Sequence, residues 1–261
     1  MKFVDPLLQG RLIRRYKRFL ADVELLDGRT VTAHTANTGA MSGCCDPGSR
    51  VWLSVAENPK RKYRYTWELV EVDSAHQKTL VGINTLRANH LVAEAIANGR
   101  VDSLSHYQNM RKEVRYGEEN SRIDLLLTAR QFGDQSADQY DNRCDNRCND
   151  NDQCTDQCYV EVKNVTLARS GIGYFPDAKS VRAIKHLREL TQITTQGARA
   201  VIFFCVPRED VQEVRPAGFV DPDYAKALKT ALDNGVQALA YRAKVSTEEI
   251  CLLDPLPVTL D

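Results

Sequence analysis

The sequence predicts a two-domain protein of the α/β (α+β) class, with an OB-like β-barrel at residues 1–82 and a mixed-sheet α/β domain at residues 83–261. Two observations predict this division. Residues 8–80 contain five short strand-like stretches separated by tight turns, which is typical of a small barrel of the OB type. From residue 85 onwards the expected elements follow the order α, β, β, β, α, β, α, β, which is typical of helices packed on a central sheet.

Each expected strand of the barrel is an apolar or alternating stretch that ends at a turn, such as the hairpin signal Asp27-Gly28. OB barrels commonly bind oligonucleotides. Tyr63, Tyr65 and Trp67 share one face of the last strand and could stack on the bases of a single strand. The alternative is that these aromatic residues form the barrel core. The five strands are expected at residues 10–13, 19–25, 30–34, 50–55 and 63–72.

The second domain is expected to contain three helices and five strands. Asn89 is the candidate N-cap of the first helix. In the second helix, the spacing of Val181, Ile184, Leu187 and Leu190 predicts that these side chains face the core. The helices are expected at residues 85–99, 180–191 and 222–234, and the strands at residues 111–116, 122–127, 159–163, 200–206 and 236–242.

The formal net charge is zero, but the charges are unevenly distributed. Residues 133–158 hold seven Asp and two Arg, a net charge of −5, so the rest of the chain carries +5. Clustered basic side chains can bind phosphates through salt-dependent contacts, although they can also be ordinary solvated surface. The candidates for contact with DNA phosphates are Arg14, Arg15, Arg18, Lys60, Arg61, Lys62, Arg64 and Lys185.

Two absences in the sequence indicate the compartment. There is no run of about 18 apolar residues, so no membrane partner is expected. The N-terminal residues lack the apolar core of a signal peptide, so the expected location is the cytoplasm. In that compartment the eight cysteines do not imply disulfide bonds.

Ionised residues interrupt two apolar strand-like stretches of the second domain. Asp124 lies in Arg122-Ile-Asp-Leu-Leu-Leu, and Glu161 and Lys163 lie in Tyr159-Val-Glu-Val-Lys. Glu161 and Lys163 are two residues apart, so they project from the same face of a strand. Two carboxylates and a lysine are what phosphodiester hydrolysis with Mg²⁺ or Mn²⁺ needs: oxygen ligands for the ion, and a cation that positions water and stabilises the phosphate. The alternative is a salt-bridged strand edge.

This arrangement resembles the PD-(D/E)xK nuclease superfamily, whose domain is the restriction-endonuclease-like fold. The resemblance implies that a helix Glu, a strand Asp and a strand (D/E)-x-K surround the metal ion. Glu94, Asp124, Glu161 and Lys163 match in type and order, so Glu94, Asp124 and Glu161 become the candidate metal ligands. The next helix of that superfamily often supplies a basic or amide side chain.

The basic residues of the expected 180–191 helix offer three candidates for that side chain, with the helical register left open. They are Arg182, Lys185 and His186.

Several motifs in order resemble the bacterial sugar fermentation stimulation protein A (SfsA) family, nearly from end to end. The resemblance implies an OB-like domain followed by a nuclease-like domain, non-specific DNA binding and a regulatory link to sugar (maltose) metabolism. It leaves two compatible hypotheses: a DNA-binding protein, and a metal-dependent nuclease. The motifs are Asn37-Thr-Gly39, Arg122-Ile-Asp124, Val160-Glu-Val-Lys-Asn-Val-Thr166, Tyr174-Phe-Pro-Asp-Ala178 and Lys185-His-Leu-Arg-Glu-Leu190.

The acidic segment 131–158 is predicted to be an exposed, low-complexity insert. Cys144, Cys148, Cys154 and Cys158 lie in it with the spacing Cys-x3-Cys-x5-Cys-x3-Cys. Four thiolates can hold a zinc ion, but the usual Cys-x2-Cys spacing is absent, so a polar loop with incidental thiols is the competing interpretation. A zinc-stabilised interaction module is therefore a third hypothesis.

Overall fold

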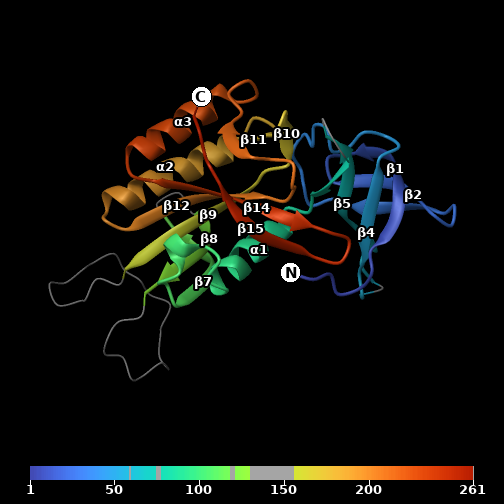
Figure 1. Ribbon diagram of the computed structural model, residues 1–261, viewed down its shortest axis with the longest axis horizontal. Coiled ribbons are helices and arrows are strands. Elements are labelled where there is room, and N and C mark those ends of the chain that lie inside the picture. The colour runs from blue at the N-terminus through green and yellow to red at the C-terminus, as the bar shows by residue number, and fades with distance from the viewer. Residues whose placement is uncertain (59, 75–77, 118–120, 130–155, 261) are drawn as a thin grey trace.

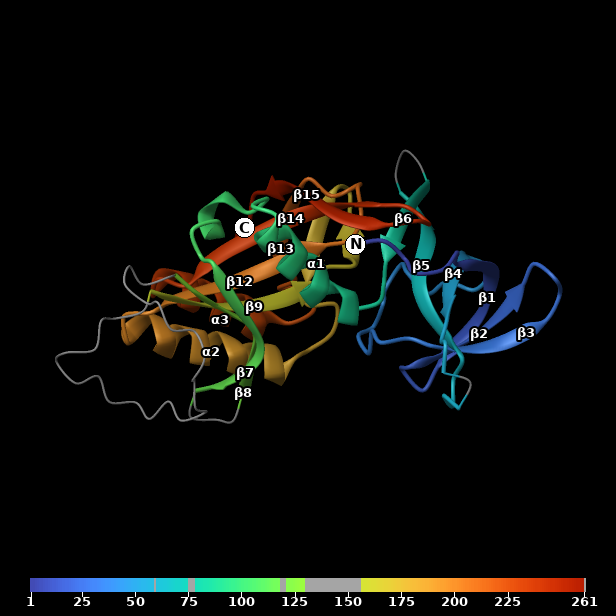
Figure 2. The same cartoon turned by 90° about the horizontal axis from the view of Figure 1, so that it is seen from below.

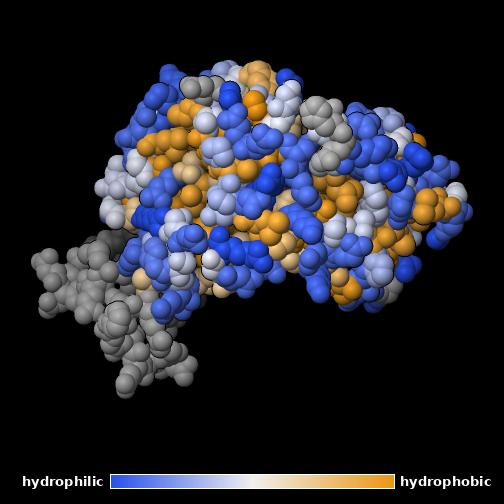
Figure 3. Space-filling model, viewed as in Figure 1, coloured by the Kyte–Doolittle hydropathy of each residue, from blue (hydrophilic) through white to orange (hydrophobic). Residues whose placement is uncertain are grey.

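A computed structural model of the chain shows two domains side by side, a β-barrel and a mixed α/β domain (Figure 1). It describes residues 1–58, 60–74, 78–117, 121–129 and 156–260. None of the helices in these ranges is long and apolar enough to cross a membrane. On the face drawn in Figure 3, hydrophilic residues cover much of both domains and an apolar group lies over α2 and α3.

The N-terminal domain is a closed barrel, as predicted. Its strands form one sheet in the order β3-β2-β1-β4-β5-β6, and a parallel pairing of β3 with β5 closes it. Trp67 is fully buried in the barrel core, so the core interpretation is correct for this residue and it cannot stack on bases. The strands are β1 (Leu8–Tyr16), β2 (Leu20–Leu25), β3 (Thr30–His34), β4 (Arg50–Val55), β5 (Tyr65–Asp73) and β6 (Lys78–Gly82).

The C-terminal domain is built on a six-stranded mixed sheet in the order β15-β14-β12-β9-β8-β7. The central strand β12 is parallel to both β9 and β14, whereas the outer pairings are antiparallel. A small sheet, β10-β11-β13, lies beside it. The strands are β7 (Asn109–Tyr116), β8 (Ser121–Thr128), β9 (Gln157–Asn164), β10 (Leu167–Arg169), β11 (Ile172–Phe175), β12 (Arg199–Val206), β13 (Glu213–Pro216), β14 (Gln237–Val245) and β15 (Ile250–Leu256).

Helices cover both faces of this sheet (Figures 1 and 2). α1 (Leu86–Ala97) packs on one face, and α2 (Val181–Thr195) and α3 (Pro222–Asp233) pack on the other. Alternate residues of β9 therefore enter different cores: Val160 and Val162 face α1, whereas Glu161 and Lys163 face α2. The two charged side chains lie on the same face of the strand, as the spacing predicts.

The structure differs from the sequence prediction at several elements. The strands β6, β13 and β15 were not predicted. The segment expected to be a glycine-rich turn contains the hairpin β10–β11, whose turn residues Ser170 and Gly171 have positive φ. Asn89 is not the N-cap of α1, because that position is Thr85. In α2 the predicted core residue Val181 is exposed, and the buried face includes His186 and Glu189. The spacing of apolar residues did not predict the buried face of α2, because two polar residues occupy buried positions on it.

Candidate metal centre and nucleic-acid site

Asp124 lies where β8 and β9 separate. The pairing of these strands runs from Thr128 to Leu125 and stops before Asp124. Beyond that point the Asp124 carboxylate takes the place of a ladder partner, because Oδ2 accepts a hydrogen bond from the Val162 backbone N–H at 2.7 Å. Oδ1 accepts one from Nδ2 of Asn89 on α1, also at 2.7 Å. The fork thus fixes a carboxylate between α1 and β9.

Glu161 lies on β9 beside this fork and is 2% exposed. Its Oε1 accepts a hydrogen bond from Lys163 Nζ at 2.7 Å and also contacts Nδ1 of His186. Arg182 Nε donates to Nε2 of His186 at 3.4 Å. Because an arginine can only donate, Nε2 must accept, and the imidazole proton is on Nδ1, where it donates to Glu161. Of the α2 candidates, His186 contacts the Glu161 carboxylate.

The two carboxylates have opposite pKa shifts. Burial, and then the charge of Glu161, raises the pKa of Asp124 to about 6. Burial would also raise the pKa of Glu161, but the charge of Lys163 and the contact with His186 outweigh it and hold this pKa below its usual value. Opposite shifts of two neighbouring acids are typical of functional sites.

A second buried carboxylate, which sequence reasoning missed, lies on the same side of the sheet. Glu189 of α2 is 1% exposed, and neither of its oxygen atoms has a hydrogen-bond partner among the residues that the structure describes. The Tyr116 hydroxyl and Oε2 of Glu161 are also buried without a partner. Burial, and then the charges of Glu161, Glu189 and Asp124, raises the pKa of Tyr116. The position of Glu189, three residues after His186 on the helix, is the sequence signal that could have found it.

Glu94 is not part of this cluster. It lies on α1 with its side chain 44% exposed, and its carboxylate pairs with the N-terminal ammonium of Met1 at 2.7 Å. Asn89 is the α1 residue that contacts Asp124. Within the described ranges, no group of three or more His, Cys, Asp or Glu side chains is arranged to hold a metal ion. The structure therefore brings together Asp124, Glu161 and Lys163 and leaves Glu94 apart.

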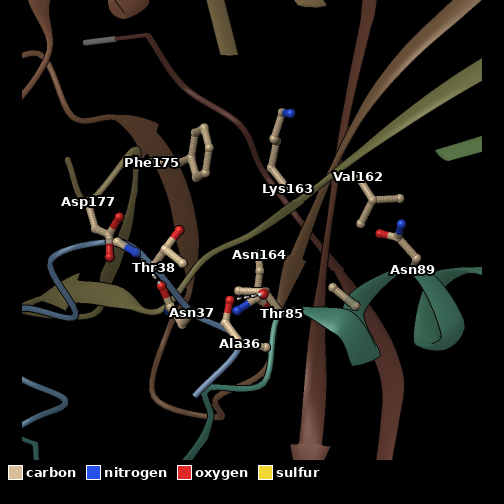
Figure 4. A pocket seen from close by; sticks show the side chains of 12 residues that line it. Ala36, Asn37, Thr38, Thr85, Asn89, Val162, Lys163, Asn164, Phe175 and Asp177 are labelled. Carbon is tan, nitrogen blue, oxygen red and sulfur yellow. Dashed lines mark hydrogen bonds between the residues drawn. The ribbon is translucent and has the colours of Figure 1, made fainter. Parts of the chain in front are cut away.

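A pocket opens beside the fork, between the two domains (Figure 4). Asn89, Val162 and Lys163 line it, so it borders the carboxylate site directly. In Figure 4, Asn37, Thr38 and Asp177 lie on the opposite side from Asn89 and Val162. The Asn37-Thr-Gly39 and Tyr174-Phe-Pro-Asp-Ala178 motifs are thus neighbours of the Val-Lys-Asn end of β9.

Most of the predicted DNA contacts lie on the barrel surface. Arg14 is exposed and pairs with Asp22 at 2.8 Å. Lys185 is partly buried on α2, next to His186. The other exposed basic residues lie near the β1–β2 turn or between β4 and β5; they are Arg18, Lys60, Arg61, Lys62 and Arg64.

Arg15 has a different role in the structure. Its guanidinium donates to the backbone carbonyls of Asn37 and Gly39 at 3.0 and 2.8 Å and to that of Arg18 at 2.6 Å. These hydrogen bonds hold the loop that lines the pocket. Arg15 is therefore a structural residue of this loop.

The zinc hypothesis falls mainly on Cys144, Cys148 and Cys154, which lie outside the described residues. Cys158 is fully buried in β9 and belongs to the core under α1. Burial raises the pKa of its thiol to about 12.

An OB barrel joined to a mixed α/β sheet, with carboxylates at a strand fork, defines the class of this two-domain protein. Two family models match the chain: the SfsA N-terminal OB domain at residues 13–83 and the sugar fermentation stimulation protein RE domain at residues 86–249. The chain belongs to the sugar fermentation stimulation protein (SfsA) family.

Relatives and a solved structure agree with this assignment over the full length. Sugar fermentation stimulation protein homologues from Pseudoalteromonas atlantica and Geobacter metallireducens are 48% and 49% identical, covering 99% and 100% of both chains. The structure of Pyrococcus furiosus SfsA in complex with Ca²⁺ has a TM-score of 0.80 at 24% identity and covers 99% of this chain and 98% of that one. That likeness bears out the fold.

Proposed function

We propose that this protein binds DNA and holds a divalent metal ion at Asp124 and Glu161, where a phosphodiester can be cleaved. One observation carries the proposal: a buried carboxylate, Glu161, and a partly buried one, Asp124, come from different strands and lie close to Lys163, which contacts Glu161 at 2.7 Å. A salt bridge at a strand edge would be exposed, whereas Glu161 is 2% exposed and keeps one oxygen atom without a partner. Buried carboxylates are costly unless a cation or hydrogen bonds compensate them.

The oxygen donors at this site suit Mg²⁺ or Mn²⁺, which bind a few carboxylates and retain several waters. Oε2 of Glu161, one oxygen of Asp124 and the Val162 carbonyl would be the ligands. A divalent cation supplies positive charge at the phosphate and makes a bound water acidic. Lys163 would exchange its contact with Glu161 for the phosphate, and His186 would keep Oε1 of Glu161 in place. The relative from Pyrococcus furiosus was solved with Ca²⁺, which supports divalent binding in this family.

The exposed basic residues of the barrel support the DNA-binding part of the proposal. Lys60, Arg61, Lys62 and Arg64 lie in one loop, where they can contact phosphates without regard to base sequence. Non-specific contacts of this kind fit a protein that acts on DNA in the cytoplasm. They would also serve the regulatory link to sugar (maltose) metabolism that the family resemblance implies.

Calorimetric titration with Mn²⁺ tests the metal site. The wild type should bind Mn²⁺, Glu161→Ala should lose binding, and Glu94→Ala should bind as the wild type does, because the Glu94 carboxylate pairs with the Met1 ammonium and not with the fork. Equal heats from the wild type and Glu161→Ala would remove the proposal. Loss of binding in Glu94→Ala would move the site to α1.

Cleavage is tested separately with single-stranded, duplex and branched DNA in the presence of Mn²⁺. Products should appear with the wild type and disappear with Lys163→Ala, because the phosphate loses its lysine contact. Products that persist in Lys163→Ala would show that the cutting takes place elsewhere. Binding of all three DNAs without products would leave a DNA-binding protein with a metal site and refute the nuclease activity.

A further inference from the structure

We propose that the pocket between the domains binds one unpaired nucleotide of a DNA strand next to the phosphate at the metal site. The inference rests on the proposed function and adds the class of DNA that the site accepts. The pocket lies next to the carboxylate site, because Val162 and Lys163 belong to both. A strand whose phosphate lies at the fork would place its neighbouring nucleotide in this pocket.

The size of the pocket favours a single nucleotide. Its cavity volume is about 190 Å³, below the roughly 300–1,000 Å³ of pockets that hold drug-sized ligands. A base pair in a duplex therefore does not fit. Walls from the barrel, α1 and β9 border the space, so only a nucleotide that has left its base pair could enter between them.

The chemistry of the lining also suits a nucleotide. Nδ2 of Asn164 is buried and has no hydrogen-bond partner within the described ranges, and Asn164 lines the pocket. An amide is the group that pairs with the edge of a base or with a sugar oxygen. Phe175 lines the same pocket and is only partly buried, so it offers an aromatic surface to a base. Thr38 supplies a hydroxyl from the barrel side.

The loop on the barrel side is held in place before any ligand arrives. Arg15 donates to the carbonyls of Asn37 and Gly39. Asp177 Oδ2 accepts from the Met41 N–H at 3.0 Å. The Asp177 carboxylate lies so close to Gly39 that a Cβ there would be 2.2 Å from Oδ1. These contacts give one explanation for three motifs of the sequence, since Asn37-Thr-Gly39, Val162-Lys-Asn164 and Phe175-Pro-Asp177 meet in the pocket.

The test compares the affinity of the full chain for a labelled single strand and for a blunt duplex of the same length, at one salt concentration. Ca²⁺ replaces Mn²⁺ to avoid cutting. The variants are Asn164→Ala and Phe175→Leu, and the matched control is Phe219→Leu, which alters an exposed aromatic residue outside the pocket. Mn²⁺ titration of each protein reports the metal site independently, and melting curves check folding.

The wild type should prefer the single strand. Asn164→Ala should weaken single-strand binding about two- to tenfold, as expected for one lost hydrogen bond, and leave blunt-duplex and Mn²⁺ affinities unchanged. Phe175→Leu should act in the same direction, and Phe219→Leu should have no effect. Equal affinity of the wild type for both DNAs, or an unchanged ratio in Asn164→Ala, would overturn the pocket while Mn²⁺ binding kept the metal site intact.

The opposite pattern is also informative. A single-strand preference that falls in Asn164→Ala, without Mn²⁺ binding in the wild type, would support the pocket and overturn the metal site. An absence of binding to either DNA would overturn both proposals.

Discussion

Two buried glutamates of this chain have opposite surroundings. Glu68 is 2% exposed and accepts hydrogen bonds from Ser54, Asn84 and Arg87, the last at 2.5 and 2.9 Å. Glu189 is 1% exposed, and in the described part of the chain neither of its oxygen atoms has a hydrogen-bond partner. Glu68 joins the barrel to α1, whereas burial of the Glu189 carboxylate lowers the stability of the fold. Residues that weaken a fold without a compensating contact are often found at functional sites.

Replacing each glutamate with glutamine should therefore change stability in opposite directions. Glu189→Gln should raise the free energy of unfolding by about 1–3 kcal/mol, because a neutral amide is less costly to bury than a carboxylate. Glu68→Gln, the matched control, should lower it by about 3–5 kcal/mol, because Arg87 loses its charged partner. Denaturant unfolding of the two variants measures both. A lower stability of Glu189→Gln would show that hydrogen bonds or ion pairs stabilise the Glu189 carboxylate in the folded protein.

The raised pKa of Asp124 predicts pH-dependent metal binding. Burial, and then the charge of Glu161, brings this pKa to about 6, and a metal ion binds only the ionised carboxylate. Mn²⁺ affinity should rise with pH until about 6 and then level off. About one pH unit below the pKa of Asp124 it should be about tenfold lower. Calorimetry at about pH 5 and about pH 7.5 checks this. Equal affinities at the two pH values would contradict it.

The same shift has a consequence for the metal-free chain. The folded state binds the Asp124 proton more tightly than the unfolded state, whose pKa is near 3.8. The stability contributed by this group is therefore present below about pH 4 and is lost as the pH rises through about 6.

At the scale of elements, the fork between β8 and β9 could be predicted from the sequence only in part. An Asp in an apolar strand and the Glu-x-Lys pair predicted the two strands and the shared face of Glu161 and Lys163, and the structure brings these three residues together. The structure places the Glu94 carboxylate against Met1, and the α1 residue that reaches Asp124 is Asn89, five positions earlier. A helix turns about 100° per residue, so the identity of the inward-facing residue depends on packing that the sequence does not state.

The register of α2 shows the same limit. Apolar spacing pointed to Val181, which is 82% exposed, and passed over His186 and Glu189, which are buried. Buried polar residues look like surface positions in a sequence, because their partners come from other elements. The hairpin β10–β11 was missed because its two strands are only three and four residues long.

The loop between β4 and β5 gives a prediction at this scale. Replacing Lys60, Arg61, Lys62 and Arg64 together with alanine should weaken DNA binding. Each lost phosphate contact should lower the slope of log affinity against log salt by about 0.7–0.9, or about three in total. Anisotropy titrations at several salt concentrations measure the slope. An unchanged slope would place the DNA elsewhere.

Arg15→Ala provides the comparison for the alanine variant of the β4–β5 loop, because Arg15 was also a predicted DNA contact. Because Arg15 holds backbone carbonyls of the 37–39 loop, its loss should lower stability by about 1–3 kcal/mol rather than act mainly through the salt slope.

At the scale of the whole molecule, the two domains meet through close backbone contacts. The Gly82 N–H donates to the Pro207 carbonyl at 2.8 Å, and the Met41 N–H donates to Asp177 at 3.0 Å. The sequence predicted both domains and their boundary near residue 82. It could not show that the barrel loop forms a wall of the site in the second domain, since no sequence pattern records contacts between distant segments.

Gly39→Ala tests whether this junction matters. The new Cβ would be 2.2 Å from Oδ1 of Asp177, so stability should fall by about 1–3 kcal/mol and single-strand affinity should fall with it. Gly218→Ala is the control, because the nearest atom to its Cβ would be 3.7 Å away. Thermal melting and anisotropy measure the two effects. A Gly39→Ala protein that behaves like Gly218→Ala would show that the loop yields easily.

The most direct test of the metal site is a crystal structure grown with Mn²⁺, with the ion located by its anomalous scattering. One ion should lie between Asp124 and Glu161, about 2.0–2.2 Å from an oxygen of each, a distance typical of small divalent ions. Lys163 Nζ should have moved away from Oε1 of Glu161, its partner at 2.7 Å without the ion. An ion at Glu94 instead, or no ion at the fork in crystals soaked to saturation, would contradict the account.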